Sequence, residues 1–237
     1  MTNKKIMIIL LFLSFIAFAV IYYNLTMFTI QRYFLIGLLF IIPFIVIGII
    51  YLLYFKSIIN QKLATWFLVI SIILSIILGF KGLVFISVTD LLSEVTDIKE
   101  YDRMLAFEKY TGYVDHFPEI IPFRASNIKF YYRPQVLQGG MEFQLKMFLP
   151  KENIEFYRNK YSNNCIKILD TNDIKSLNEF GIFTVGNYVS DKSILPDYTL
   201  YLIKNRQDMY NSWNHGAVAF IAISNNNNYL LFQTEIW

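Results

Sequence analysis

The first 89 residues contain neither aspartate nor glutamate, and all 18 acidic residues of the chain lie between Asp90 and Glu235. A carboxylate inside the hydrocarbon core of a bilayer costs several kcal/mol, so membrane-spanning segments exclude it. The absence of acid therefore divides the chain into an apolar membrane half and a C-terminal half of ordinary soluble composition.

Cysteine and histidine are also scarce. Cys165 is the only cysteine, which excludes an intramolecular disulfide, and His116 and His215 are the only histidines. Zinc sites need three or four protein ligands, usually Cys and His, so we expect no metal site. We expect no cofactor either, because the turn Gln138-Gly139-Gly140 lacks the following helix that a phosphate-binding loop requires.

The overall charge of +3 hides two opposite balances. Six basic residues give the membrane half +6, and the remaining 15 basic residues against 18 acidic ones leave the C-terminal half near −3. A nucleic-acid-binding domain needs a basic patch that displaces counterions from phosphates. The sequence therefore predicts no nucleic acid partner.

Three long apolar runs fill the membrane half, at residues 6–23, 33–55 and 64–88. An α-helix rises about 1.5 Å per residue, so roughly 20 apolar residues cross the hydrocarbon core. Each run is long enough, and the three together predict a multi-pass cell-membrane protein with the lipid bilayer as its first partner.

The basic residues between the runs predict the orientation. Lys4 and Lys5 precede the first run, and Lys56 and Lys62 lie between the second and third, whereas Arg32 alone lies between the first and second. Positive charge accumulates on the cytoplasmic side. We therefore expect a cytoplasmic N-terminus and, after three crossings, an extracytoplasmic C-terminal half.

The first run also fits a secretory signal peptide, because Ala17-Phe18-Ala19 resembles a cleavage site. The apolar run continues to Tyr23, which favours an uncleaved anchor. Cleavage would leave the C-terminal half on the same side of the membrane.

Lys81 is the one charge at membrane depth. It could serve an ion pathway or bind a partner. We favour a simpler interpretation, in which this lysine near the outer end of the third run extends its amine to the interface.

Beyond the membrane half, residues 90–112 are interpreted as a stalk helix and residues 113–237 as an α+β domain. Apolar residues recur at three- and four-residue steps from Leu91 to Tyr110, which predicts a helix that ends at Gly112. The result is a three-helix transmembrane region followed by an extracytoplasmic α+β domain.

Alternating apolar and polar residues predict a largely antiparallel sheet of about six strands, with two or three helices on one side. The run 217–224 is apolar throughout, so it should lie centrally with both faces covered. In 141–149, Glu142, Gln144 and Lys146 are expected to face solvent. The expected strands are 127–133, 141–149, 165–169, 182–189, 198–204, 217–224 and 229–235, and the expected helices are 150–161 and 173–180.

The candidate binding residues combine aromatic, cationic and turn positions. Tyr131 and Arg133 could form an aromatic–cationic patch, and the turn 138–140 follows them. His116 and His215 could meet in space, but Asp115, His116 and Glu119 do not form a recognisable acid–base cluster, since neighbours in an extended segment point to opposite sides. We predict no catalytic residue.

One stretch resembles a known group. His116-Phe117-Pro118 with Pro122, then 130–134, 137–140 and Leu149-Pro150, are similar to uncharacterised membrane-anchored proteins of spore-forming Gram-positive bacteria. The resemblance covers residues 113–161. It implies an envelope location and supplies no catalytic residues.

Together these features predict an envelope protein that displays an extracytoplasmic binding domain and is not an enzyme. Its expected partner is another membrane protein or an extracellular protein or peptide. Two alternatives remain open: a self-protection protein that intercepts a toxin at the cell surface, and an envelope enzyme.

Overall fold

The computed structural model describes residues 3–27, 29–135, 140–190, 192–207 and 216–237. Its contacts divide the chain into two compact units, Met1–Leu91 and Leu92–Trp237. The boundary falls two residues from the start of the acidic half, so the change in composition is also a change in fold.

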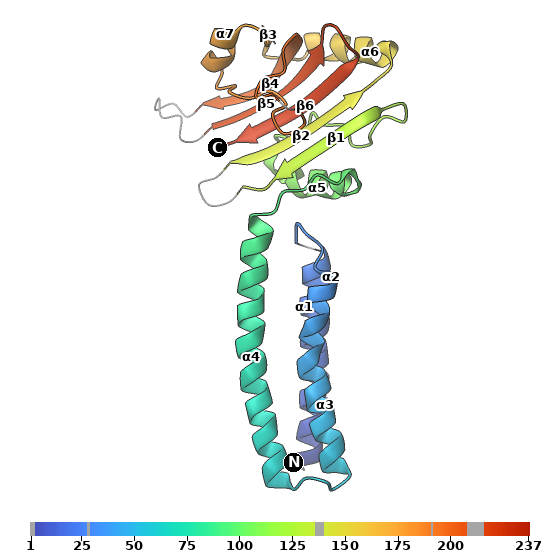
Figure 1. The fold of residues 1–237 in the computed structure, drawn as a ribbon, viewed down its shortest axis with the longest axis vertical. Coiled ribbons are helices and arrows are strands. Elements are labelled where there is room, and N and C mark those ends of the chain that lie inside the picture. The colour runs from blue at the N-terminus through green and yellow to red at the C-terminus, as the bar shows by residue number, and fades with distance from the viewer. Residues whose placement is uncertain (1–2, 28, 136–139, 191, 208–215) are drawn as a thin grey trace. The chain divides into compact units, whose positions relative to one another are not determined.

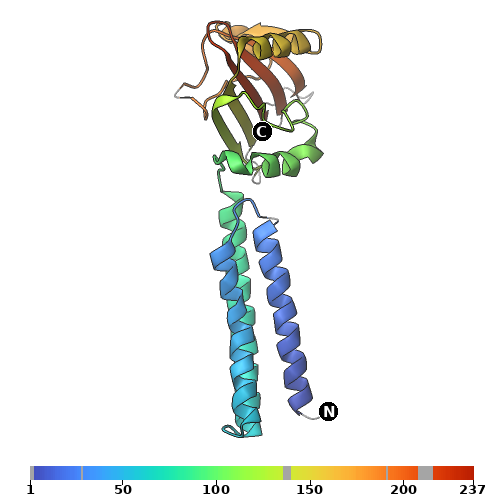
Figure 2. The ribbon, with the colours of Figure 1, turned by 90° about the vertical axis from the view of Figure 1, so that its right-hand side faces the viewer.

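The first unit consists of helices. Three of its segments are long and apolar enough to cross a membrane, which confirms the three predicted spans. The helices run alongside one another (Figures 1 and 2). Their bounds are α1 Asn3–Met27, α2 Phe34–Leu38, the 3-10 turn η1 Leu39–Ile41, α3 Ile42–Phe55 and α4 Gln61–Leu91.

The second span changes from α2 through η1 to α3 beside Pro43. Proline has no backbone N–H, so it cannot donate the hydrogen bond that an uninterrupted α-helix would make to Leu39. A short 3-10 turn before the proline accommodates the missing hydrogen bond.

Asp90, the first acidic residue, lies at the end of α4. Its carboxylate accepts hydrogen bonds from the backbone N–H groups of Ile30 and Gln31, each at 2.8 Å. The first acid of the chain therefore fastens the connection between α1 and α2 to the end of the third span.

The second unit is built on one six-stranded antiparallel sheet in the order β1-β2-β6-β5-β4-β3 (Figure 1), which confirms the predicted α+β class. β5 is buried along its whole length at the centre, as its apolar sequence predicts. The strands are β1 Ser126–Arg133, β2 Met141–Phe148, β3 Lys167–Asp170, β4 Tyr198–Gln207, β5 Gly216–Ser224 and β6 Tyr229–Ile236.

The helix predicted for residues 91–110 is broken. After α4, Val95 pairs with Tyr132 of β1 through two 2.9 Å backbone hydrogen bonds. The Asp97 side chain then caps the 3-10 turn η2 Ile98–Glu100 by accepting from Lys99 N. Regular helix resumes only in α5 Tyr101–Glu108 and closes through η3 Lys109–Thr111 at Gly112, whose φ is 69°.

One face of the sheet is covered by α5 and by α6 Lys151–Ser162. Tyr101 of α5 packs edge-on against Phe130 at 5.5 Å between ring centroids, and Tyr157 of α6 packs against Phe232 at 5.8 Å. Phe117 lies 4.8 Å from Phe143. This aromatic layer is the core of that face.

The opposite face is covered by α7 Ile174–Glu179 and the segment 182–197. The strand predicted for 182–189 does not form, because Gly186 adopts φ 70° and turns the chain out of an extended path. Only Val185 makes a bridge, to Ile194. This cover also overturns the prediction that Glu142 and Gln144 face solvent, since both are buried beneath it.

Candidate functional site

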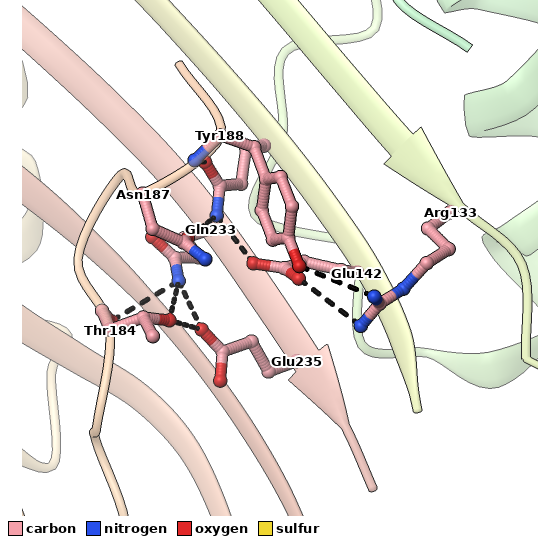
Figure 3. Close-up of polar contacts among 8 residues, drawn as sticks. Arg133, Glu142, Thr184, Asn187, Tyr188, Gln233 and Glu235 are labelled. Atoms are coloured by element: carbon pink, nitrogen blue, oxygen red, sulfur yellow. Dashed lines mark hydrogen bonds and ion pairs between the residues drawn. The ribbon is translucent and has the colours of Figure 1, made fainter. Parts of the chain in front are cut away.

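A row of four polar side chains crosses the covered face between β2 and β6. Glu142 lies opposite Glu235 in the register (Figure 3), and Gln144 lies opposite Gln233. Both glutamines have no exposed surface and Glu142 retains only 4%. Buried polar groups must be hydrogen-bonded to be tolerated, so this row depends on what lies over it.

The covering segment supplies backbone and side-chain partners for both glutamines. Gly186 N donates to Gln233 Oε1 at 2.7 Å, and Tyr188 N donates to Gln144 Oε1 at 3.3 Å. Gln144 Nε2 donates in turn to Asn187 Oδ1 at 2.6 Å. The two buried amides therefore hold the segment in place over the sheet.

The two carboxyl groups are partnered differently. Glu142 Oε1 accepts from Gln144 Nε2 at 2.6 Å, and its Oε2 lies 3.5 Å from the guanidinium of Arg133. Glu235 Oε1 accepts from the Thr184 hydroxyl and from Gln233 Nε2. Figure 3 shows the two carboxyl groups as neighbours on adjacent strands.

Burial and, second to it, the negative charge of Glu235 raise the pKa of Glu142 to about 8, while Arg133 opposes the change. Burial also raises the pKa of Glu235, against the hydrogen bond from Thr184. Two facing carboxyls cannot both ionise without mutual repulsion. Near neutral pH the pair therefore retains a proton.

Arg133 and Tyr188 form the solvent-facing side of the cluster. The Arg133 side chain is 40% exposed and Tyr188 is 42% exposed. Arg133 Nη1 donates to the Tyr188 hydroxyl at 3.2 Å, and the guanidinium carbon lies 5.6 Å from the Tyr188 ring centroid. Tyr188 stacks on Tyr131 at 4.0 Å with an interplanar angle of 4°.

The predicted pair of Tyr131 and Arg133 is thus brought together, but Tyr131 is buried and Tyr188 takes its place at the surface. Lys81 is exposed on α4 of the first unit and does not belong to this cluster. Gln138, Gly139 and His215 lie outside the described residues.

Gly140 has a steric role. A Cβ atom at this position would collide with the carbonyl oxygen of Ile236. The backbones of β2 and β6 approach so closely at this end that only glycine fits.

His116 lies on the opposite face of the sheet, where its ring is 4.6 Å from Phe117 and 6.2 Å from Phe232. Its Nε2 atom is buried and has no hydrogen-bond partner. Burial lowers the pKa of His116 to about 4. His116 and Arg133 lie on opposite faces of the sheet and do not meet.

The residues beside His116 make separate ion pairs. Asp115 Oδ2 lies 3.2 Å from Lys204 Nζ, and Glu119 Oε1 lies 2.6 Å from Lys109 Nζ. Neither carboxylate bonds to the imidazole.

A third buried carboxyl lies on the face that His116 shares. Glu108 of α5 is 4% exposed, and its Oε1 accepts a 2.7 Å hydrogen bond from the Tyr132 hydroxyl. Burial raises the pKa of Glu108, and the bond from Tyr132 opposes the increase.

Sequence reasoning missed the carboxyl pair, although a signal was present. Glu142 and Gln144 alternate along one strand, and Gln233 and Glu235 alternate along another, so each strand carries two polar residues on one face. Pairing of these two strands would have placed the four together. What the pattern cannot show is that an irregular segment covers them.

Among the residues that the structure describes, no three histidine, cysteine or carboxylate groups are placed to hold one metal ion. The cluster offers an exposed arginine and an exposed tyrosine that are hydrogen-bonded to each other. No family model, curated protein or solved structure matches the chain.

Proposed function

We propose that this chain is a membrane-anchored envelope protein whose second unit lies outside the cytoplasm and binds a protein or peptide through Arg133 and Tyr188. In this proposal the domain is a binding module and not an enzyme. The three apolar helices are the anchor.

The orientation is supported by the four lysines that precede the first span or lie between the second and third. Protease added to intact protoplasts should then remove the region after Asp90 and spare the loop that carries Lys56 and Lys62. Lysed protoplasts are the control, in which both regions are cut. A protected C-terminal region in intact protoplasts would reverse the orientation.

Binding is supported by the way Arg133 is held. The guanidinium is held by the Glu142 carboxyl 3.5 Å away, by a hydrogen bond to the Tyr188 hydroxyl and by the adjacent ring, while the side chain stays 40% exposed. Arginine and tyrosine are enriched among the residues that dominate binding energy at interfaces. A side chain that is ordered before binding loses less entropy when a partner arrives.

The test uses a photoreactive amino acid in place of Tyr188 in the native cells, with Phe156 of α6 as a second position. Phe156 is also an exposed aromatic, but it lies on the opposite face. We expect one crosslinked partner at position 188 that is absent at position 156. Equal capture at both positions would argue against a site at Tyr188.

The partner found in this way is then titrated against purified variants. Arg133→Ala should weaken its binding at least tenfold, while Arg124→Ala, which removes a solvent-exposed ion pair with Glu152, should leave the affinity within about twofold. Unchanged affinity in Arg133→Ala would refute the proposed site.

A second candidate function, an envelope enzyme, is favoured by one observation. Glu142 and Glu235 form a facing carboxyl pair with raised pKa values, and such pairs occur at acid–base catalytic sites. Glu142→Gln separates the two functions, because it keeps the size and the hydrogen-bonding oxygen. A binding module keeps at least part of its cellular function in this variant, because Arg133 retains its hydrogen bond to Tyr188, whereas an acid–base enzyme loses its function as completely as a deletion.

A further inference from the structure

The Tyr188 hydroxyl keeps a hydrogen that it can donate. Arg133 Nη1 donates to this hydroxyl, so the hydroxyl oxygen is the acceptor in their contact and its own O–H is not used there. Among the residues that the structure describes, Arg133 is the one hydrogen-bond partner of the Tyr188 side chain. A group that binds at this hydroxyl from solvent must therefore accept a hydrogen bond.

The Arg133 guanidinium also keeps donors for a group in solution. It carries several N–H groups and has no acceptor atom. Its Nη2 atom lies 3.5 Å from Glu142 Oε2. This ion pair is longer than the roughly 2.7–2.9 Å of a charge-assisted hydrogen bond. Within the described part of the chain, the guanidinium thus makes one hydrogen bond, to Tyr188, while its side chain stays 40% exposed.

The two donor groups lie side by side on ordered side chains. Their contact is 3.2 Å long, and Figure 3 shows the tyrosine hydroxyl and the guanidinium meeting beside Glu142. The Tyr188 ring stacks on the buried Tyr131 at 4.0 Å, and the Tyr188 backbone N–H donates to Gln144 Oε1. One acceptor group from a partner can therefore contact both donors without first ordering them.

The local charge favours an anionic acceptor. Burial and the charge of Glu235 raise the pKa of Glu142 to about 8, so at pH 7 this carboxyl is largely neutral and compensates little of the Arg133 charge. A carboxylate fits the planar fork of a guanidinium. A phosphate group is usually bound by a cluster of basic residues, whereas Arg133 is the one basic side chain that Figure 3 draws in this site.

On the basis of the proposed function, in which Arg133 and Tyr188 bind a protein or peptide, we infer that the group bound there is a carboxylate of the partner. Its oxygens accept hydrogen bonds from the Arg133 guanidinium and from the Tyr188 hydroxyl. The carboxylate belongs to an acidic side chain or to a chain terminus, and the two sources are separated by experiment.

The experiment uses the full chain in detergent micelles, with carbon-13 at the guanidinium carbon of its arginines. The Arg133 resonance is assigned by its loss in Arg133→Lys and is followed during titration with N-acetylglutamate methylamide. N-acetylglutamine methylamide is the matched neutral probe, and N-acetylalanine presents a terminal carboxylate. Arg124, an exposed arginine that pairs with Glu152, is the control resonance in the same sample.

We expect a saturable shift of the Arg133 resonance with a carboxylate probe, and the probe that binds more tightly identifies the source of the carboxylate. Tyr188→Phe removes one donor and should weaken this binding about fivefold. Tyr110→Phe removes an exposed hydroxyl elsewhere and should leave it unchanged.

Equal binding of the glutamine probe would overturn the inference, because it would show that charge is not recognised. So would equal, unsaturated shifts of Arg133 and Arg124, or tighter binding of inorganic phosphate than of both carboxylates. These results are distinct from a failure of the proposed function. A partner crosslinked at position 188 would keep the binding site even if the carboxylate were rejected.

Discussion

Glu142 of β2 lies directly opposite Glu235 of β6, in the same register pair of an antiparallel sheet. Like charges in this position destabilise a sheet. The repulsion between the two carboxyl groups is reduced by Arg133 beside Glu142. The Thr184 hydroxyl and the Gln233 amide do the same beside Glu235. Retention of a proton on the pair removes what repulsion remains.

This pair predicts that the domain is less stable at pH 8 than at pH 6.5. The pKa of Glu142 is about 8 in the fold and 4.5 in the unfolded reference, so between these values the folded state binds more protons. Its stability must then fall as the pH rises, by at most about 1.4 kcal/mol per pH unit for one group. Denaturant unfolding at closely spaced pH values measures this slope.

Glu142→Gln should flatten the slope between pH 6.5 and 8, because glutamine stays neutral. Glu155→Gln, at a half-exposed position on α6, should leave it unchanged. A slope that persists in Glu142→Gln would show that another group carries the proton.

Because of the buried His116, we expect the stability of the domain to rise with pH in a lower pH range. Its pKa is about 4 in the fold against 6.5 as a reference, so the unfolded state binds more protons in this window. The stability that the neutral His116 ring contributes to the fold is therefore lost as the pH falls from 6.5 to 4. His116→Leu should remove this contribution and change stability at pH 7 by no more than about 2 kcal/mol. An imidazole NMR signal from His116 that titrates near pH 6.5 would contradict the burial of this ring.

Tyr132→Phe should destabilise the domain by about 1–3 kcal/mol, because it leaves the buried Glu108 carboxyl without its 2.7 Å donor. Loss of this bond also raises the pKa of Glu108 further. The same change at the exposed Tyr110 should stay within about 0.5 kcal/mol. Additivity of Tyr132→Phe with Glu108→Leu, measured by thermal unfolding, would show that the two residues do not interact.

Gly140→Ala should cost about 2 kcal/mol or more, because the added methyl group meets the fixed carbonyl of Ile236. Gly79→Ala is the control: a Cβ there has nothing within 4 Å, and alanine favours a helix. Near-UV circular dichroism follows the melting of the domain in both variants. Equal melting temperatures would show that β2 and β6 can separate at this end without cost.

The fragment 92–237 should fold alone and unfold cooperatively. The second unit has its own sheet with both faces covered, and a domain of this length can bury a core without help. Calorimetric and van't Hoff enthalpies of the fragment should agree. A broad transition with unequal enthalpies would mean that the membrane half completes the fold.

Much of the fold was predictable because its signals are local. The three spans follow from long apolar runs, and the central position of β5 follows from nine consecutive residues without a charge. These features depend on the period of a helix or a strand and need no knowledge of distant contacts.

The site was less predictable because its cover is not local. Residues 182–189 are rich in the β-branched and aromatic residues of a strand, yet Gly186 turns the segment and donates its backbone N–H to Gln233. Glu142 therefore has the sequence signature of a solvent-facing residue and the environment of a buried one. The same irregular segment places Tyr188, which no sequence pattern singled out, beside Arg133.

The position of β6 has a consequence for the order of assembly. β1 and β2 form one antiparallel pair, β3, β4 and β5 form another group, and β6 is the strand that lies between them. During synthesis the two groups of strands cannot join until residues 229–236 leave the ribosome. Until then the apolar β5 is uncovered at one edge. An uncovered apolar edge strand invites aggregation. The nascent domain thus passes through a vulnerable interval that ends only when its last strand is inserted.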